Sequence, residues 1–265
     1  MIGETTAERE IAGQEAKPLA AGKQVVYFAD LYADHNAPEL GMAAVGYLRS
    51  LGCHVVVPAD SYSGYPYFAY GDVIRSRRVA ENNVKLLLEY VRDGFEIVST
   101  EPTATHCLKS LYPRLLDNDT LAVEVAEHSH AFFTYVLRTL DGAIPPGAAL
   151  TLKGRRLGFH IACHQRGLDG GRDTIEWLQR QGAEVVVVEN GTCCGMGGTF
   201  GMKSGPLGRD LALAVGGPLF DAFREAEIES IVTESSVCRI HIEQGTGLRA
   251  FHPLELTMTT TGSQP

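Results

Sequence analysis

The residues best suited to chemistry in this 265-residue sequence are four cysteines of its C-terminal half: Cys163, Cys193, Cys194 and Cys238. In sequence, 29 residues separate Cys163 from the adjacent pair Cys193-Cys194, and 43 separate that pair from Cys238. Adjacent cysteines form a strained disulfide with each other, and neighbouring thiolates repel unless a cation relieves the repulsion. Thiolate sulfur is a preferred ligand of zinc, copper(I) and iron–sulfur clusters. The four residues therefore predict a sulfur-ligated metal centre.

Glycines follow the cysteine pair closely, in the segment TCCGMGGTFG (192–201). Glycine lets a backbone N–H group come close enough to hydrogen-bond a ligand sulfur, and we expect Gly195 to support the centre in this way. The segment also resembles a dinucleotide-binding fingerprint. Its spacing is G-x-G-x-x-x-G, however, and no acidic residue follows at the required distance, which disfavours nucleotide binding.

Short β-branched runs alternate with longer amphipathic stretches along the chain, and this alternation predicts an α/β fold with mostly parallel sheets. The expected strands are 23–29, 53–58, 95–100, 155–162, 183–189 and 229–235. The expected helices are 40–51, 73–94, 119–140, 174–181 and 207–226.

The pattern occurs twice. SLGCHVVVP (50–58) aligns with RQGAEVVVV (180–188) at an offset of 130 residues, and EIVSTEP (96–102) aligns with SIVTESS (230–236) at an offset of 134. Such a long period favours a duplicated domain. The alternative is two unrelated α/β units that share a general pattern.

We therefore expect two duplicated parallel-sheet α/β lobes related by pseudo-two-fold symmetry, over 23–146 and 147–256. Flexible tails are expected at 1–22 and 257–265 because both segments are polar. The cysteines follow the ends of three strands of the second lobe. Ligands of open parallel sheets bind outside the carboxyl ends of the strands, so the four thiols are expected to converge there.

The charge balance limits the choice of partners. Lys and Arg number 23 against 32 Asp and Glu, a net charge of −9, which disfavours nucleic acid and anionic membranes. No apolar run approaches the roughly 18 residues of a transmembrane helix. The polar start indicates no signal peptide, so we expect a cytoplasmic protein with reduced cysteines.

The segments CHQRG (163–167), CCGMGGTFG (193–201), TESSVCRIHIEQGTG (233–247) and FHPLEL (251–256) resemble the cysteine-rich CCG domain family. This family includes the B subunit of heterodisulfide reductase, the C subunit of anaerobic glycerol-3-phosphate dehydrogenase, the glycolate oxidase iron–sulfur subunit and lactate utilisation protein A. Its members usually carry two such domains in tandem. The resemblance covers 23–256 and is strongest in the second half.

The resemblance implies that Cys163, Cys193, Cys194 and Cys238 hold a [4Fe–4S] cluster. Ser235 stands where the family pattern Cys-x-x-Cys has its first cysteine. Five cysteines hold a noncubane cluster in heterodisulfide reductase, whereas four suffice for an ordinary cubane cluster. The cluster type therefore stays open. Ser235 is an oxygen ligand, a hydrogen-bond donor or a bystander.

The first half departs from the family pattern at every ligand position. The cysteine positions fall near Leu31, on Tyr62-Ser63-Gly64 and on Ala104, which implies a degenerate domain without a cluster. Cys53 and Cys107 match no ligand position and are expected in the core.

Other side chains near the cysteines are each compatible with more than one role. His164 is a candidate for a hydrogen bond to a thiolate or for metal ligation, although a purely structural position is equally compatible with the sequence. Lys203 and Arg239 are candidates for balancing cluster charge or binding an anion, with simple solvation as the alternative. Three histidines are assigned structural roles: His160, His241 and His252.

Together these features predict an iron–sulfur electron-transfer subunit of a multi-subunit redox complex. The sequence has no C-x-x-C-x-x-C-x-x-x-C-P ferredoxin run, so a partner must supply the next redox centre. The expected partners are a flavoprotein dehydrogenase, a ferredoxin-type iron–sulfur subunit, and a quinone or membrane-anchored protein that brings the chain to the inner face of the membrane. Whether the protein itself catalyses a reaction stays open.

Three alternatives stay open at this point. Four thiolates, or three with His164, can hold zinc without redox chemistry. The chain can also be an inactive structural or assembly subunit. Metal-free thiol–disulfide catalysis is the third alternative, and an oxidised Cys194–Cys238 pair would support it.

Overall fold

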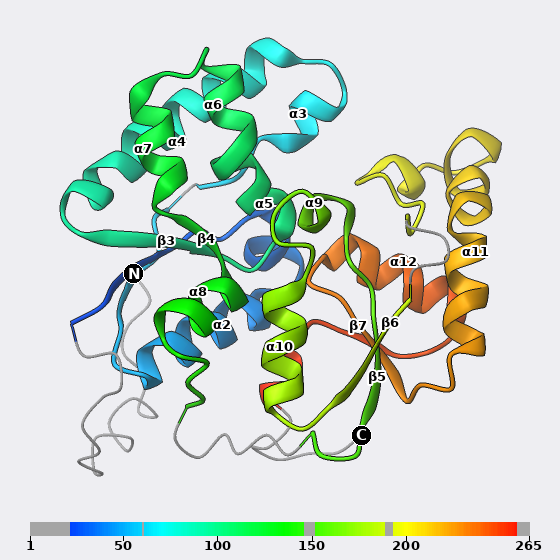
Figure 1. The fold of residues 1–265 in the computed structure, drawn as a ribbon. Coiled ribbons are helices and arrows are strands. Elements are labelled where there is room, and N and C mark those ends of the chain that lie inside the picture. The colour runs from blue at the N-terminus through cyan, green and yellow to red at the C-terminus, as the bar shows by residue number, and fades with distance from the viewer. Residues whose placement is uncertain (1–21, 60, 146–151, 189–192, 259–265) are drawn as a thin grey trace.

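The computed structural model describes residues 22–59, 61–145, 152–188 and 193–258, which form two α/β lobes (Figure 1). Each lobe contains a four-stranded sheet, ordered β2-β1-β3-β4 in the first and β6-β5-β7-β8 in the second. All paired strands are parallel. The expectation of two parallel α/β lobes is confirmed, and the identical strand order fits a duplication.

The first lobe begins with β1 and ends with α8. Its strands are β1 (Gln24–Tyr27), β2 (His54–Val56), β3 (Phe95–Ser99) and β4 (Ser129–Ala131). Its α-helices are α2 (Pro38–Ser50), α3 (Tyr65–Ala69), α4 (Val73–Arg92), α5 (Pro102–His106), α6 (Tyr112–Leu115), α7 (Thr120–Glu127) and α8 (Phe132–Thr139). Two π-helical turns are η2 (Tyr32–Asn36) and η3 (Cys107–Leu111).

The second lobe repeats this plan with fewer helices. Its strands are β5 (Arg156–Phe159), β6 (Glu184–Val187), β7 (Ser230–Val232) and β8 (Ala250–Phe251). Its helices are α9 (Cys163–Arg166), α10 (Arg172–Arg180), α11 (Leu211–Glu225), α12 (Ser236–Thr246) and α13 (Glu255–Met258). Short turns η4 (Phe200–Met202) and η5 (Pro206–Asp210) precede α11.

Some sequence expectations were wrong in detail. The predicted helix 119–140 is two helices, α7 and α8, separated by β4, because residues 129–131 pair with β3 instead of continuing the helix. The predicted helix 207–226 starts as the π turn η5 and becomes α-helical at Leu211. Of the expected tails, the structure describes Gly22, Thr257 and Met258, and the last two belong to α13. The boundary at 146–147 lies outside the described residues.

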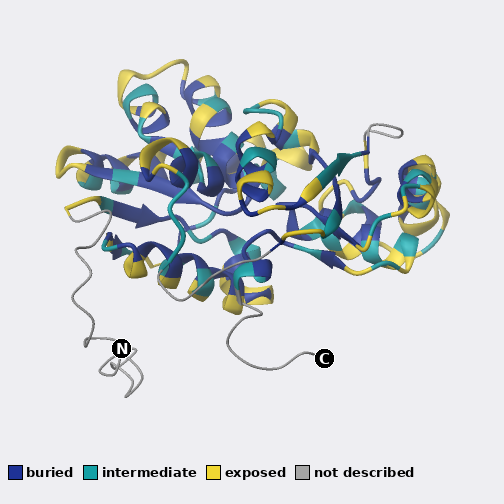
Figure 2. Cartoon of the chain, turned by 60° about the horizontal axis from the view of Figure 1, so that its bottom comes forward, coloured by how far each residue is buried: buried dark blue, intermediate teal, exposed yellow. Residues whose placement is uncertain are grey.

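One hydrophobic core joins the two lobes. It contains Phe132 and Phe133 from α8 of the first lobe together with Phe159, Trp177 and Leu254 from the second. The rings of Phe133 and Trp177 have centroids 4.8 Å apart. Figure 2 shows the buried strands between helices whose outer faces are exposed. The lobes are therefore held together by buried apolar surface, which limits their movement relative to each other.

The remaining cysteines lie in these cores, as expected. Cys53 belongs to the core that spans both lobes, and Cys107 lies fully buried in the core of the first lobe. None of the helices in the described part of the chain is both long and apolar enough to span a bilayer.

Candidate metal centre

Three loops of the second lobe carry the four cysteines, and all three follow strands of one parallel sheet. Cys163 begins α9 just after β5, and Cys193-Cys194 follow β6. Cys238 lies in the first turn of α12, which follows β7. Since β6, β5 and β7 are neighbours in the sheet, their carboxyl ends bring these loops to the same edge.

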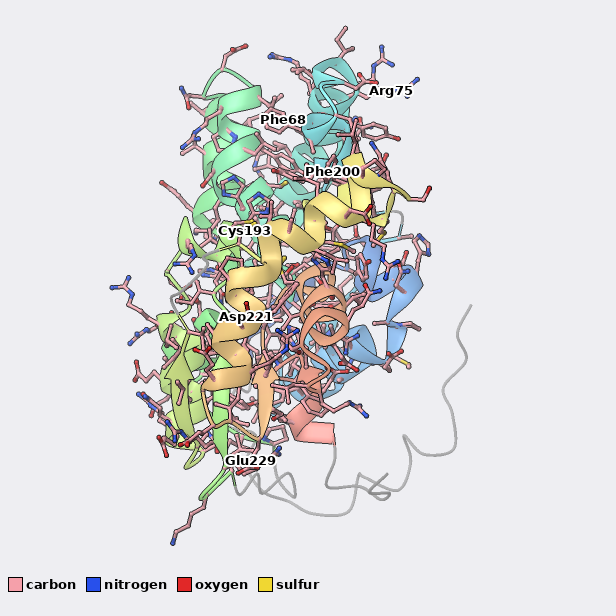
Figure 3. All side chains as sticks on the ribbon, turned by 90° about the vertical axis from the view of Figure 1, so that its right-hand side faces the viewer. Phe68, Arg75, Cys193, Phe200, Asp221 and Glu229 are labelled. Atoms are coloured by element: carbon pink, nitrogen blue, oxygen red, sulfur yellow. The ribbon has the colours of Figure 1, made fainter. Side chains whose placement is uncertain are left out.

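The structure brings two of these thiols into contact at this edge. The Sγ atoms of Cys194 and Cys238 are 3.1 Å apart, and both residues are buried. Cys163 and Cys193 are exposed, so the set has a buried half and an open half. In the view of Figure 3, Cys193 lies between Phe68 of the first lobe and Asp221 of α11.

The buried and the exposed cysteines affect one another's pKa values. Burial raises the pKa of the Cys163 thiol, and the charges of Cys193 and Cys194 raise it further. The Cys238 hydrogen bond lowers the pKa of Cys194 to about 3, against the opposing effect of burial. The same bond, with burial, raises the pKa of Cys238. Cys194 and Cys238 therefore share one proton, and a cation bound by their sulfurs would displace this proton.

Gly195 supports the cysteine pair through its backbone. Its N–H group donates a hydrogen bond to Cys193 Sγ at 3.3 Å, as expected from the sequence. The residue adopts φ +87°, and a Cβ atom there would lie 2.1 Å from the carbonyl oxygen of Ala212. The turn after the cysteines can therefore pack on α11 only with glycine at this position.

Ser235 lies beside Cys238 at the N-cap of α12 and is buried. A hydrogen bond from its side chain lowers the pKa of Cys238, so its hydroxyl is within reach of the sulfur. This position suits a hydrogen-bond donor to a ligand thiolate and leaves oxygen ligation open.

His164 lies on the side of Cys163 that faces the first lobe. Its Nδ1 is 2.9 Å from Thr103 Oγ1, and its ring stacks on His106 and meets Tyr65 edge-on. Burial, with help from His106, lowers the pKa of His164 to about 4, so the ring is neutral at physiological pH. These contacts place the His164 ring at the interface between the two lobes.

His160 is the residue near the thiols that sequence reasoning missed. One of its imidazole nitrogens and the sulfurs of Cys194 and Cys238 all lie within 4.8 Å of one another. The residue follows β5 directly and is 1% exposed. It lies only three residues before Cys163 in a predicted strand, and this closeness to a candidate ligand could have indicated its place beside the thiols.

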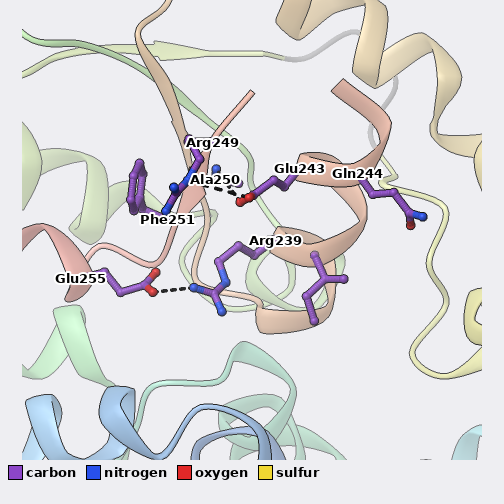
Figure 4. Close-up of a pocket in the computed structure, with 8 residues that line it drawn as sticks. Arg239, Glu243, Gln244, Arg249, Ala250, Phe251 and Glu255 are labelled. Carbon is purple, nitrogen blue, oxygen red and sulfur yellow. Dashed lines mark hydrogen bonds and ion pairs between the residues drawn. The ribbon is translucent and has the colours of Figure 1, made fainter. Parts of the chain in front are cut away.

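Lys203 and Arg239 are both engaged in other contacts. The Nζ atom of Lys203 lies over the ring of Tyr70, 4.6 Å from its centroid. Arg239 forms an ion pair with Glu255 at 2.5 Å inside a pocket of about 460 Å³ (Figure 4). None of the four cysteines lines this pocket, so it is separate from the thiol set.

The first lobe has a polar network where the second has its cysteines. Ser63, at the position of the second cysteine of the pair, donates hydrogen bonds from its backbone N and its Oγ to the Asp30 carboxylate, each at 2.9 Å. Tyr112 donates to the carbonyl of Ser63. Gly64 has φ +66°, so the turn keeps the left-handed glycine of its counterpart.

The donor set fits a metal that prefers sulfur. Four cysteines lie on segments at one edge of the sheet, two of their sulfurs are 3.1 Å apart, and Nδ1 of the adjacent His160 has no hydrogen-bond partner among the described residues. Such a set suits zinc or an iron–sulfur cluster and lacks the oxygen ligands that magnesium and calcium prefer.

Residues 157–243 match the cysteine-rich domain family, CCG. The chain is 30% identical over 252 residues to the C subunit of anaerobic glycerol-3-phosphate dehydrogenase from Escherichia coli (strain K12), covering 94% of this chain and 61% of that protein. It is 27% identical over 250 residues to lactate utilization protein A of Geobacillus kaustophilus (strain HTA426), covering 88% of this chain and 98% of that protein.

Among solved structures, an ABC transporter solute-binding protein from Burkholderia multivorans aligns with 91% of this chain at 13% identity. Its TM-score of 0.28 is too low to indicate a shared fold. The cysteines that the structure places at one sheet edge lie within the residues that match the cysteine-rich domain. Residues 157–243 thus match the CCG cysteine-rich domain family, and the chain is similar over most of its length to the anaerobic glycerol-3-phosphate dehydrogenase C subunit and to lactate utilization protein A.

Proposed function

We propose that this protein is an iron–sulfur electron-transfer subunit of a multi-subunit redox complex, with one [4Fe–4S]-type cluster held by Cys163, Cys193, Cys194 and Cys238. The observation that carries the proposal is the contact of thiols from two segments at one sheet edge, where the Cys194 and Cys238 sulfurs are 3.1 Å apart, with Cys163 following the neighbouring strand β5. When bound, such a cluster supplies one-electron chemistry.

The residues around the thiols would set the properties of the cluster. The Gly195 N–H group and the Ser235 hydroxyl donate hydrogen bonds to ligand sulfurs, which stabilises the more reduced, more negative state. The exposure of Cys163 and Cys193 leaves one side of the site open to a partner. Electrons would enter and leave there, since the opposite side is buried in the protein.

The partners we propose are a flavoprotein dehydrogenase, a ferredoxin-type iron–sulfur subunit, or both. One relative is named as the C subunit of a dehydrogenase, and this chain spans 61% of its length. In such a complex a partner subunit would exchange electrons with the centre proposed here. We further propose a cytoplasmic location, held at the inner face of the membrane by a quinone-reactive or membrane-anchored partner.

We also propose that the lobe over 23–146 is a degenerate copy without a cluster, while the lobe over 147–256 holds the centre. The support is the side chains at the first-lobe positions, Leu31, Ser63 and Ala104, none of which provides a thiolate. The Asp30–Ser63 hydrogen bonds take the place of metal ligation in holding the turn.

Anaerobic purification tests the main proposal. We expect a brown protein with about four irons and four sulfides per chain. Cys194→Ala and Cys238→Ala should remove the colour, whereas Cys53→Ala, which alters a buried cysteine away from the site, should keep it. A folded, colourless and iron-free wild-type protein would reject the proposal.

A zinc site is the second candidate, favoured by the His160, Cys194 and Cys238 group, whose spacing suits a single ion. Metal analysis by mass spectrometry separates the two candidates. One zinc per chain without iron or visible absorption would indicate a structural centre and a structural role for the protein in its complex.

A further inference from the structure

We propose that His160 is a direct ligand of the metal centre and supplies the donor that is missing where Ser235 replaces a cysteine. This inference rests on the proposed function only in requiring that the site bind a metal. It adds an imidazole to the four thiolates and does not depend on the partners or on the direction of electron flow.

The first support is geometric. An imidazole nitrogen of His160 lies within 4.8 Å of the sulfurs of both Cys194 and Cys238, and these sulfurs are 3.1 Å apart. All three residues are buried. One metal atom between them would be held by two sulfurs and one nitrogen, a donor set that both zinc and iron accept.

The second support is an unsatisfied polar atom. His160 is 1% exposed, and its Nδ1 has no hydrogen-bond partner among the described residues. A buried polar nitrogen without a partner costs about 1–3 kcal/mol. The His160 side chain also hydrogen-bonds Cys194, so the polar ring at this buried position is directed toward the thiol pair.

The third support comes from comparing the two lobes. The N–H group of His160 bonds to the carbonyl of Val232 at 2.9 Å, and the N–H group of Phe28 bonds to the carbonyl of Val98 at the same distance. Phe28 and His160 thus occupy the same position in the two copies. The lobe that lacks the cysteines of the proposed centre has a fully buried phenylalanine there, and the lobe that carries them has a histidine.

Neither of the other nearby histidines fits the role as well. His164 uses Nδ1 for Thr103 and stacks on His106. His241 is also buried, and its Nδ1 also lacks a partner among the described residues, but it is not one of the three residues that meet within 4.8 Å. The His241 side chain hydrogen-bonds Cys194 as well, so its substitution tests contact with a ligand sulfur without ligation.

Ligation by His160 has a consequence for redox chemistry. A neutral imidazole in place of a thiolate makes the centre less negative, which raises its reduction potential. His160→Cys should therefore lower the potential. His241→Gln, which keeps a hydrogen-bonding side chain beside Cys194, should change it less.

The decisive measurement is pulsed EPR on the iron-loaded protein, in its paramagnetic state, labelled with ¹⁵N-histidine. We expect a strongly coupled nitrogen whose signal changes with the isotope. His164→Gln and His241→Gln should keep this coupling, and His160→Cys should lose it while retaining iron. Absence of a strongly coupled nitrogen in the wild type, or its persistence in His160→Cys, would overturn the assignment.

X-ray absorption at the metal edge keeps this test separate from that of the proposed function. If the metal is zinc, the electron-transfer proposal fails, but one imidazole in the zinc shell that is lost in His160→Cys still supports ligation. If iron is present with sulfur neighbours alone, the ligand assignment fails and the iron–sulfur proposal stands. Should His160→Cys not fold, the wild-type spectrum with the two control variants decides. A folded protein that binds no metal overturns both.

Discussion

At the scale of single residues, the hydroxyl of Ser235 is the feature that most affects the type of centre. It lies within hydrogen-bond reach of the Cys238 sulfur, at the position where the family pattern has a further cysteine. A thiol there would add a sulfur donor beside an existing ligand. It would also remove a hydroxyl that donates a hydrogen bond. Losing this donor destabilises the more negative, reduced state of the centre.

We therefore predict that Ser235→Cys changes the EPR spectrum and lowers the reduction potential of the bound cluster. The neighbouring Ser236→Cys is the control, because the Ser236 hydroxyl bonds to Glu101 in place of a cysteine sulfur. An EPR signal in Ser235→Cys identical to that of the wild type would place Ser235 outside the ligand sphere.

A second residue of interest is Glu101, a buried carboxyl at the contact between the lobes. Burial raises its pKa to about 8, although hydrogen bonds from Ser236 act in the opposite direction. The folded protein keeps the Glu101 proton up to about pH 8, whereas the unfolded chain releases it near pH 4 to 5. Between these values the folded state binds more protons, so this carboxyl makes stability fall as pH rises.

We predict that Glu101→Gln flattens this dependence between about pH 5 and 8, where one such group contributes up to about 1.4 kcal/mol per pH unit. The glutamine keeps an acceptor for Ser236 and cannot ionise. Urea unfolding of the metal-free protein at several pH values measures the effect, with exposed Glu225→Gln as the control. Parallel curves for Glu101→Gln and the wild type would contradict the prediction.

At the scale of elements, the turn that carries Cys193 and Cys194 depends on its contact with α11. We predict that Gly195→Ala lowers stability by about 2–4 kcal/mol and abolishes metal binding, because its Cβ would overlap the Ala212 carbonyl oxygen. Thermal unfolding and metal content measure the two effects.

Gly198→Ala is the matched control for this variant. Gly198 also has positive φ, at +64°, but a Cβ there meets no atom within 4 Å. Backbone strain alone should cost it about 1–2 kcal/mol and leave metal binding intact. Equal effects of the two substitutions would mean that packing on α11 is not what fixes the turn.

Most of both sheets could be predicted from sequence because six strands are short apolar runs, most of them β-branched, bounded by glycines or polar residues. The strands β4 and β8 could not, because β4 (SHA) has no β-branched residue and interrupts an amphipathic stretch, and β8 spans two residues. Likewise, the type and spacing of the cysteines were enough to select them as candidate ligands. His160 does not, because a single histidine after a strand resembles many core histidines until the fold places it beside the sulfurs.

At the scale of the whole molecule, the shared core should make the two lobes unfold as one unit. Trp177 is the only tryptophan of the chain, lies fully buried and contacts Phe133 of the other lobe. We predict a single transition in the metal-free protein, with tryptophan fluorescence and far-UV circular dichroism changing together. Fluorescence that changes well before the circular dichroism would show that the lobes separate first and unfold independently.

The half-open arrangement of the sulfurs also has a consequence for the lifetime of the centre. Cys163 and Cys193 face solvent, while Cys194 and Cys238 lie inside the protein. A cluster bound as proposed would thus be open to oxygen and chelators from one side only, and iron would enter from the same side. A partner seated over that opening would act as a shield. The isolated chain should therefore bleach in air faster than the assembled complex.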